Sequence, residues 1–187
     1  MKESDNPSAV RSKKVITDSL LELLKTCPYN EITVTQIIQN SDVARRTFYR
    51  NFTSKDDVIE AYIRSIIIEY ADNWEIRKTD SIDLIFDFVD KYKPFLMLLS
   101  KNNMLHIFLI CLNNHLPEAH MNAAREEDPY RAFFGDLDPS YLLPFHIGGI
   151  WNTIFVWMNN GMKESQDDIR LTLKSYYSSF SLSPSHR

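Results

Sequence analysis

One short stretch of the chain, residues 44–52, combines arginine and hydroxyl side chains with two phenylalanines. In an α-helix, at about 100° per residue, Arg46 and Arg50 lie on one face, and Phe48 and Phe52 lie on the opposite face. Guanidinium groups can donate paired hydrogen bonds to a guanine edge, and hydroxyl groups can hold phosphates. The stretch therefore predicts a short helix that packs by its aromatic face and binds a DNA major groove by its basic face.

We assign two roles to the residues on and around this basic face. Arg46 and Thr47 are the candidates for base contacts, with Arg50 as a third candidate. Phosphate contacts are expected from hydroxyl and basic side chains nearby, namely Thr33, Thr35, Arg45, Tyr49 and Lys55. Lys55 lies where a helix is expected to begin, and the free backbone amides there also attract a phosphate.

A second short helix and a turn are expected to position the basic helix. Thr33 and Gln36 have the spacing of a capping box, in which two side chains satisfy free N–H groups at a helix start. Ser41 and Asp42 then favour a turn, because their side chains bond nearby backbone groups. Two helices joined by such a turn form a helix-turn-helix, whose second helix enters the groove. The alternative is a generic three-helix bundle whose arginines only face solvent.

The segment from Thr33 to Asp57 resembles the N-terminal helix-turn-helix of the TetR family of bacterial transcriptional regulators. The matching residues are Thr33-Val34, Ile37-Ile38, Val43, Thr47-Phe48-Tyr49, Phe52, Ser54-Lys55 and Asp56-Asp57. The family usually carries glycine in the turn where this chain has Asp42, and aspartate can also adopt the left-handed conformation. The resemblance implies a DNA-binding regulator that acts as a homodimer.

The net charge is −4 over 187 residues, but the charges are unevenly distributed. Residues 8–55 carry eight basic and four acidic side chains, a net charge of +4, which leaves −8 for the remainder. This asymmetry directs DNA binding to the N-terminal segment.

The two cysteines, Cys27 and Cys111, lack paired spacing, and no apolar run is long enough to cross a membrane. We therefore expect a soluble, cytoplasmic protein without disulfides.

The apolar pattern predicts an all-α fold of about nine or ten helices, without strands of useful length. The expected divisions are a disordered arm at 1–7, a helix-turn-helix DNA-binding domain of three helices at 8–54, a connecting helix at 55–78, and a helical ligand-binding and dimerisation domain at 79–187. In the last range we expect Pro94 and Pro117 to interrupt helices, and a short helix near 130–134. Asp138 and Pro139 should begin a long helix that Gly161 ends.

The C-terminal half resembles one branch of TetR-type regulators in two segments, PFLMLLSKN and GGIWNTIFVWMNNGMKES. That branch includes regulators of dihydroxyacetone-kinase operons, and it implies a helical effector and dimerisation domain. Many aromatic residues and methionines in this half fit a cavity for an apolar or aromatic effector. We expect the cavity to be bounded by Trp74, Phe88, Tyr92, Phe108, Phe134 and Trp151. The alternative is that these side chains fill one another's space.

The last two expected helices carry more apolar residues than one small domain needs to cover. We assign to a twofold dimer interface Ile150, Ile154, Met158, Leu173, Tyr176, Tyr177 and Phe180. Gly148 and Gly149 fit a close approach of a second backbone or a ligand, or alternatively a kinked helix within one subunit.

The sequence gives little support for catalysis or metal binding. His115 and His120 flank Glu118, but Pro117 between them disrupts helical register, so we expect no metal and no cofactor. No catalytic triad or glycine-rich phosphate loop occurs in a supporting context, so we expect that the protein is not an enzyme.

We predict a homodimeric repressor that a ligand releases from a palindromic operator. The alternatives are an activator or co-regulator whose C-terminal domain binds a partner protein, and a helical module that has lost DNA binding.

Overall fold

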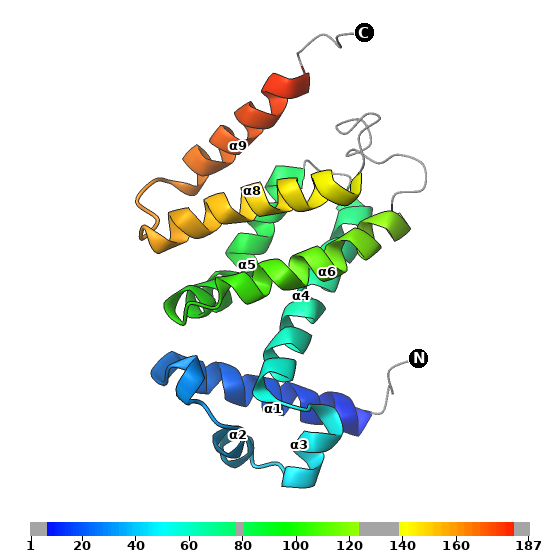
Figure 1. Cartoon of the computed structure of the whole chain (residues 1–187), viewed down its shortest axis with the longest axis vertical. Helices are drawn as coiled ribbons and strands as arrows, with labels where there is room; N and C mark the ends of the chain where they lie inside the picture. The colour runs from blue at the N-terminus through cyan, green and yellow to red at the C-terminus, as the bar shows by residue number, and fades with distance from the viewer. Residues whose placement is uncertain (1–6, 78–80, 124–138, 182–187) are drawn as a thin grey trace.

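The computed structural model describes residues 7–77, 81–123 and 139–181, and the side chains within 7–71, 82–115 and 140–178. These residues form eight α-helices and one short 3-10 helix, without a strand, which confirms the all-α prediction (Figure 1). Within them, no helix is both long enough and apolar enough to cross a membrane. The arm expected before Pro7 and the short helix expected near 130–134 lie outside the described residues.

Residues 7–54, which we call the head, contain α1 (Pro7–Thr26), the 3-10 helix η1 (Tyr29–Glu31), α2 (Val34–Ser41) and α3 (Arg45–Asn51). The three α-helices pack around a small apolar centre made of Ile16, Leu20, Leu24, Ile37 and Phe48, each of them 0 or 1% exposed. The aromatic face expected for residues 44–52 therefore anchors α3 to the other two helices.

The turn chemistry of the head follows the sequence prediction. The Thr33 hydroxyl accepts a hydrogen bond from the Gln36 N–H at 3.2 Å, and Gln36 Oε1 accepts one from the Thr33 N–H at 2.7 Å. This confirms the capping box at the start of α2. Asp42 ends α2 in the left-handed conformation, with φ 51° and ψ 34°. Asp42 therefore adopts the left-handed conformation at the position where the family that the sequence resembles usually has glycine.

Helix α4 (Lys55–Arg77) runs from the head into the rest of the molecule (Figure 1). Its start is capped by the Ser54 hydroxyl, which accepts from the Asp57 N–H at 3.1 Å. Its buried residues run from Val58 and Ile59 through Ile63 to Tyr70, and they join the apolar residues of both ends in one core cluster. α4 therefore belongs to one core that continues from the head into the rest of the molecule.

Residues 81–181, which we call the body, contain α5 (Ser81–Lys101), α6 (Leu105–Ala123), α8 (Pro139–Asn159) and α9 (Gln166–Ser181). The expected interruptions were wrong, because Pro94 lies inside α5 and α6 continues past residue 117. Pro94 is exposed, so the carbonyl that loses its hydrogen bond can be hydrated. Meanwhile Val89, Phe95 and Leu99 bury a continuous apolar face on both sides of the proline.

The helices of the body meet at corners formed by left-handed residues. Asn103 has φ 57° after α5, and Gly161 has φ 79° after α8. At both corners the next N–H reaches back to the helix: Met104 N–H to the Leu99 carbonyl at 2.7 Å, and Met162 N–H to the Trp157 carbonyl at 3.0 Å. These are Schellman motifs, and the prediction for Gly161 is confirmed.

Candidate nucleic-acid interface

Helix α3 presents a basic face to solvent at the end of the molecule away from α9 (Figure 1). Arg46 and Arg50 are exposed and Thr47 is half-buried, whereas Phe48 is 0% and Phe52 4% exposed on the other side. The two faces are those that the helical spacing predicts. The assignment of Arg46, Thr47 and Arg50 to bases stays a prediction.

Arg45 and Tyr49 form a second pair of exposed residues on α3. The Arg45 guanidinium carbon lies 5.4 Å from the centre of the Tyr49 ring, and this ring makes an edge contact with Phe48 at 5.3 Å. Cation–π contact of this kind orients the guanidinium without consuming its donors. The pair is therefore placed for phosphate contact, which stays a prediction.

A polar contact that the sequence analysis did not identify holds α2 against α1. Ser19 is 4% exposed, and its hydroxyl donates to the Ile37 carbonyl at 2.9 Å. Asn40 Nδ2 donates to the same hydroxyl at 3.1 Å, so the serine is satisfied on both sides. A single buried serine, Ser19, inside the apolar stripe of α1 is the signal that could have indicated this contact.

Thr33 and Thr35, the two threonines at the start of α2, are both exposed. The Thr33 hydroxyl already serves the capping box through Gln36. Helix N-terminal N–H groups lie beside both side chains, and such groups attract anions. Phosphate contact by these two threonines stays a prediction.

The Lys55 ammonium is engaged within the head. Its Nζ donates to the Tyr29 carbonyl at 2.6 Å and the Ile32 carbonyl at 2.8 Å, and lies 3.5 Å from the Asn30 carbonyl. It also lies 4.4 Å from the centre of the Tyr29 ring. Since an ammonium has three donors, a phosphate contact from Lys55 requires the loss of at least one of these contacts. The predicted phosphate contact stays untested, and Lys55 closes the η1 turn against α4.

Tyr29 is the second tie between η1 and α4. Its hydroxyl donates to the Asp56 carboxylate in the first turn of α4. Burial, followed by the hydrogen bond and charge of Asp56, raises the pKa of Tyr29 well above its usual range, so the hydroxyl remains a donor. The connection between α1 and α2 is therefore fastened to the helix that leads into the body.

The aromatic residues expected to bound an effector cavity pack against one another. Phe88, Phe108 and Trp151 are buried. The ring centre of Phe88 lies 5.9 Å from that of Phe108 and 5.6 Å from that of Trp151, and the ring centres of Phe108 and Trp151 lie 4.8 Å apart. A void beside Trp151 measures about 20 Å³, space for one water. The Trp74 side chain and Phe134 lie outside the described residues. Ligand contact in this region stays a prediction, and the void beside Trp151 is too small for an organic ligand.

Tyr92, the remaining predicted cavity residue, lies at the edge of this aromatic group. Its ring centre is 4.7 Å from that of Phe88, and its hydroxyl donates to Glu69 Oε2 at 2.6 Å. Hydrogen bonds from Lys91 and Tyr92 lower the pKa of the Glu69 carboxyl. Tyr92 therefore links α5 to α4, beside a surface hollow of about 190 Å³.

Most residues assigned to the dimer interface are buried within one chain: Ile150, Ile154, Met158 and Leu173 are 0 to 7% exposed. Tyr176 is 49% exposed and Tyr177 is half-buried, while the Phe180 side chain lies outside the described residues. The outward face of α8 instead carries Tyr141, Phe145 and Val156, which are 79, 65 and 50% exposed. Between them, a side chain added at Gly148 or Gly149 would meet open space. Dimerisation through the seven assigned residues stays a prediction.

Metal ligands do not gather in the described part of the chain, where no group of three or more His, Cys, Asp or Glu side chains could hold an ion. His115 is described, but the side chains of residues 116–120 are not. The expectation of no metal therefore has no structural test at that place.

Comparison with known proteins gives the class to which this fold and basic helix belong. The profile described as bacterial regulatory proteins, tetR family, matches residues 16–62, and a transcriptional regulator C-terminal region of the same family matches residues 72–178. The protein is a helix-turn-helix transcriptional regulator, a class distinct from enzymes. The chain belongs to the TetR family.

Two known proteins are similar to this chain. The HTH-type dhaKLM operon transcriptional activator DhaS of Lactococcus lactis subsp. lactis (strain IL1403) is 20% identical over 150 residues, which cover 76% of each chain. The crystal structure of a TetR transcriptional regulator from Streptococcus agalactiae 2603V is similar with a TM-score of 0.61, covering 92% of this chain and 95% of that chain at 17% identity. The similarity to the Streptococcus agalactiae structure supports the all-α fold described above.

Proposed function

We propose that the protein is a homodimeric regulator that binds a palindromic DNA operator through α3. The observation that carries the proposal is the exposed basic face of α3, fixed by the buried Phe48 and Phe52 on its other side. Two copies related by a twofold axis would place their α3 helices in successive major grooves, about 34 Å apart. Since the proposed ligand is operator DNA, we place its action in the cytoplasm.

The proposed division of labour follows the chain. Residues 8–54 bind DNA, residues 55–78 connect, and residues 79–187 bind an effector and dimerise. The dimer would have one arrangement that fits the operator and one that does not. Only an effector that binds these two arrangements with different affinities can shift DNA binding.

For the dimer, the exposed face of α8 supports a twofold contact with a second copy. Tyr141, Phe145 and Val156 would be covered there, and Gly148 and Gly149 would let two α8 helices approach closely. Tyr176, on the neighbouring α9, is exposed as well. Sedimentation at micromolar concentration tests the proposal: a dimer is expected, and a Phe145→Glu variant should sediment as a monomer. A monomeric parent protein contradicts it.

Repression released by a ligand is the first candidate for the direction of regulation. The second candidate is activation, with the body binding a partner protein. The filled aromatic core beside Trp151 favours the second, as does the relative that is named an activator. In vitro transcription from the promoter beside a bound operator separates the two. Added protein lowers the transcript level if it represses and raises it if it activates.

The test of DNA recognition compares specific and random duplexes. Arg46→Ala is expected to lose about 1–3 kcal/mol on the operator and much less on random DNA, because a base contact carries the specificity. Lys14→Ala is the control, since Lys14 is an exposed cation on α1 that pairs with Asp18. An equal loss on both duplexes would show that Arg46 contacts phosphate.

A further inference from the structure

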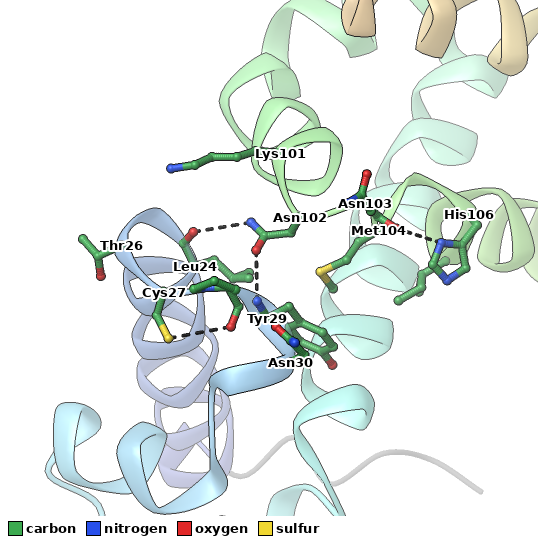
Figure 2. Close-up of a pocket in the computed structure, with 12 residues that line it drawn as sticks. Leu24, Thr26, Cys27, Tyr29, Asn30, Lys101, Asn102, Asn103, Met104 and His106 are labelled. Atoms are coloured by element: carbon green, nitrogen blue, oxygen red, sulfur yellow. Dashed lines mark hydrogen bonds between the residues drawn. The ribbon is translucent and has the colours of Figure 1, made fainter.

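A groove of about 590 Å³ lies where the head meets the body. The end of α1 and the η1 turn form one wall, and the corner between α5 and α6 forms the other (Figure 2). Its volume falls in the range of small-molecule sites. The groove is therefore large enough for an organic ligand, unlike the void of about 20 Å³ beside Trp151.

Asn102 bridges the two walls of this groove (Figure 2). Its Oδ1 accepts a hydrogen bond from the Tyr29 N–H at 3.0 Å, and its Nδ2 donates to the Leu98 carbonyl of α5 at 2.9 Å. The same amide nitrogen lies 3.5 Å from the Leu24 carbonyl of α1. Tyr29 in turn holds α4, since its carbonyl accepts from Lys55. A molecule that displaces Asn102 therefore weakens the contact between body and head.

The chemistry of the lining indicates which molecule would fit. The groove residues that the structure describes include no carboxylate, whereas Lys101 supplies an ammonium and Asn30, Asn102 and Asn103 supply amide donors. Met104 and Ile107 supply apolar surface. Lys101 is exposed and donates to the Lys25 carbonyl at 3.2 Å, which leaves further ammonium donors for a ligand. A cation would find no opposite charge in this lining.

We propose that the groove binds a small organic acid and that its occupation weakens DNA binding. The carboxylate would lie at Lys101 and the apolar part against Met104 and Ile107. The acid favours the state in which Asn102 has left Tyr29, so binding of acid and binding of DNA oppose each other with one coupling free energy. The site stands on the groove alone, and the coupling rests on the proposed DNA-binding function.

Cys27 lines the groove, so the rate at which its thiol is alkylated tests whether the groove is occupied. This test needs no DNA. Cys27 is half-buried, whereas Cys111 is buried and burial raises the pKa of its thiol to about 11, so iodoacetamide should alkylate Cys27 first. Octanoate is the probe, and octanol and octylamine are controls of equal chain length. We expect millimolar octanoate to slow alkylation about tenfold, the controls to slow it far less, and Lys101→Met to abolish the difference. Equal rates with and without octanoate overturn the site.

The coupling is tested by filling the groove covalently. The reagent 2-sulfonatoethyl methanethiosulfonate forms a disulfide with the Cys27 sulfur, releases methanesulfinate, and leaves a sulfonate in the groove. The labelled protein should keep its helical circular dichroism and bind DNA about tenfold more weakly, a change of about 1.4 kcal/mol. Treated Cys27→Ser should be unchanged. Asn102→Ala should itself lower the DNA affinity, and in this variant the label should add little.

Each outcome decides a different claim. Labelled protein that binds DNA as tightly as unlabelled protein overturns the coupling. An unlabelled protein that binds no duplex DNA contradicts the proposed function, and the alkylation rates still decide whether the groove binds acids.

Discussion

The head and the body are both helical, but different interactions define their helices. In the head, short helices begin and end at local signals: Thr33 caps α2, and Asp42 ends it in the left-handed conformation. In the body, α5 continues through Pro94, because a long apolar face is buried on both sides of this proline, and α8 contains Pro144 in its second turn. A DNA-binding surface needs fixed geometry over a few residues, and local signals provide it. A helical body tolerates local defects as long as its faces stay buried.

The largest expected effect compares one phenylalanine from each region. Phe48 and Phe108 are both 0% exposed, so each change to alanine should lower the free energy of unfolding by about 3–5 kcal/mol, measured by urea denaturation. At equal folded fractions, Phe48→Ala should still bind DNA poorly, because Phe48 anchors the basic helix. Phe108→Ala should bind nearly normally. Equal DNA affinities of the two folded variants would contradict the distinction between the regions.

The next largest effect concerns Lys55. Lys55→Met keeps the aliphatic stem but removes the ammonium that donates to the carbonyls of Tyr29 and Ile32. Urea denaturation should show a loss of about 1–3 kcal/mol. Lys14→Met, which removes an exposed ion pair with Asp18, should change stability by less than about 0.5 kcal/mol. If Lys55→Met instead keeps its stability and lowers the salt dependence of DNA binding, Lys55 acts on phosphate.

A smaller effect tests the device that both regions share. Asp42 in the head and Asn103 in the body have φ of 51° and 57°, where a side chain is strained and glycine is not. Asp42→Gly and Asn103→Gly should each raise the free energy of unfolding by about 0.5 kcal/mol, measured as a higher thermal midpoint. Gly161→Ala, at φ 79°, should lower the free energy of unfolding by about 1 kcal/mol. A loss of stability in both glycine variants would show that the original side chains make contacts worth more than the strain.

The smallest effect depends on pH and acts on the body, since all five histidines follow the head in sequence. Burial lowers the pKa of His146 below its ordinary 6.5, and its Nδ1 lies 3.0 Å from the Tyr177 hydroxyl. The unfolded chain therefore binds a proton at a higher pH than the folded chain. This contribution to stability is present above pH 6.5 and is lost as the pH falls through the lowered pKa. Urea midpoints from pH 7.5 to pH 5 should fall less steeply for His146→Gln. Parallel slopes would show that other groups control the decline.

Local features could be predicted from the sequence. The start of α4, the capping box at Thr33 and the turn at Gly161 each depend on residues within one or two helical turns of each other. The basic face of α3 follows from helical spacing in the same way. These features need no knowledge of what packs against them.

Features that depend on tertiary packing could not be predicted. The expected break at Pro94 was wrong, because a proline costs one hydrogen bond while the burial of α5 depends on neighbours distant in sequence. α8 is apolar nearly all round, so the sequence could not show that Ile150 and Ile154 face inward and Phe145 outward. The carbonyls that hold Lys55 come together only when η1 folds against α4. No spacing in the sequence marks that arrangement.

The shared core along α4 has a consequence for amide hydrogen exchange. Ile63, Ile66 and Ile67 are 0 to 3% exposed at the middle of this helix. Their N–H groups should exchange with solvent only when the whole chain opens, so the two ends of the molecule form a single cooperative foldon there. A signal that reaches the head then moves it as a unit on a protected helix, because melting the junction would cost the stability of the entire protein.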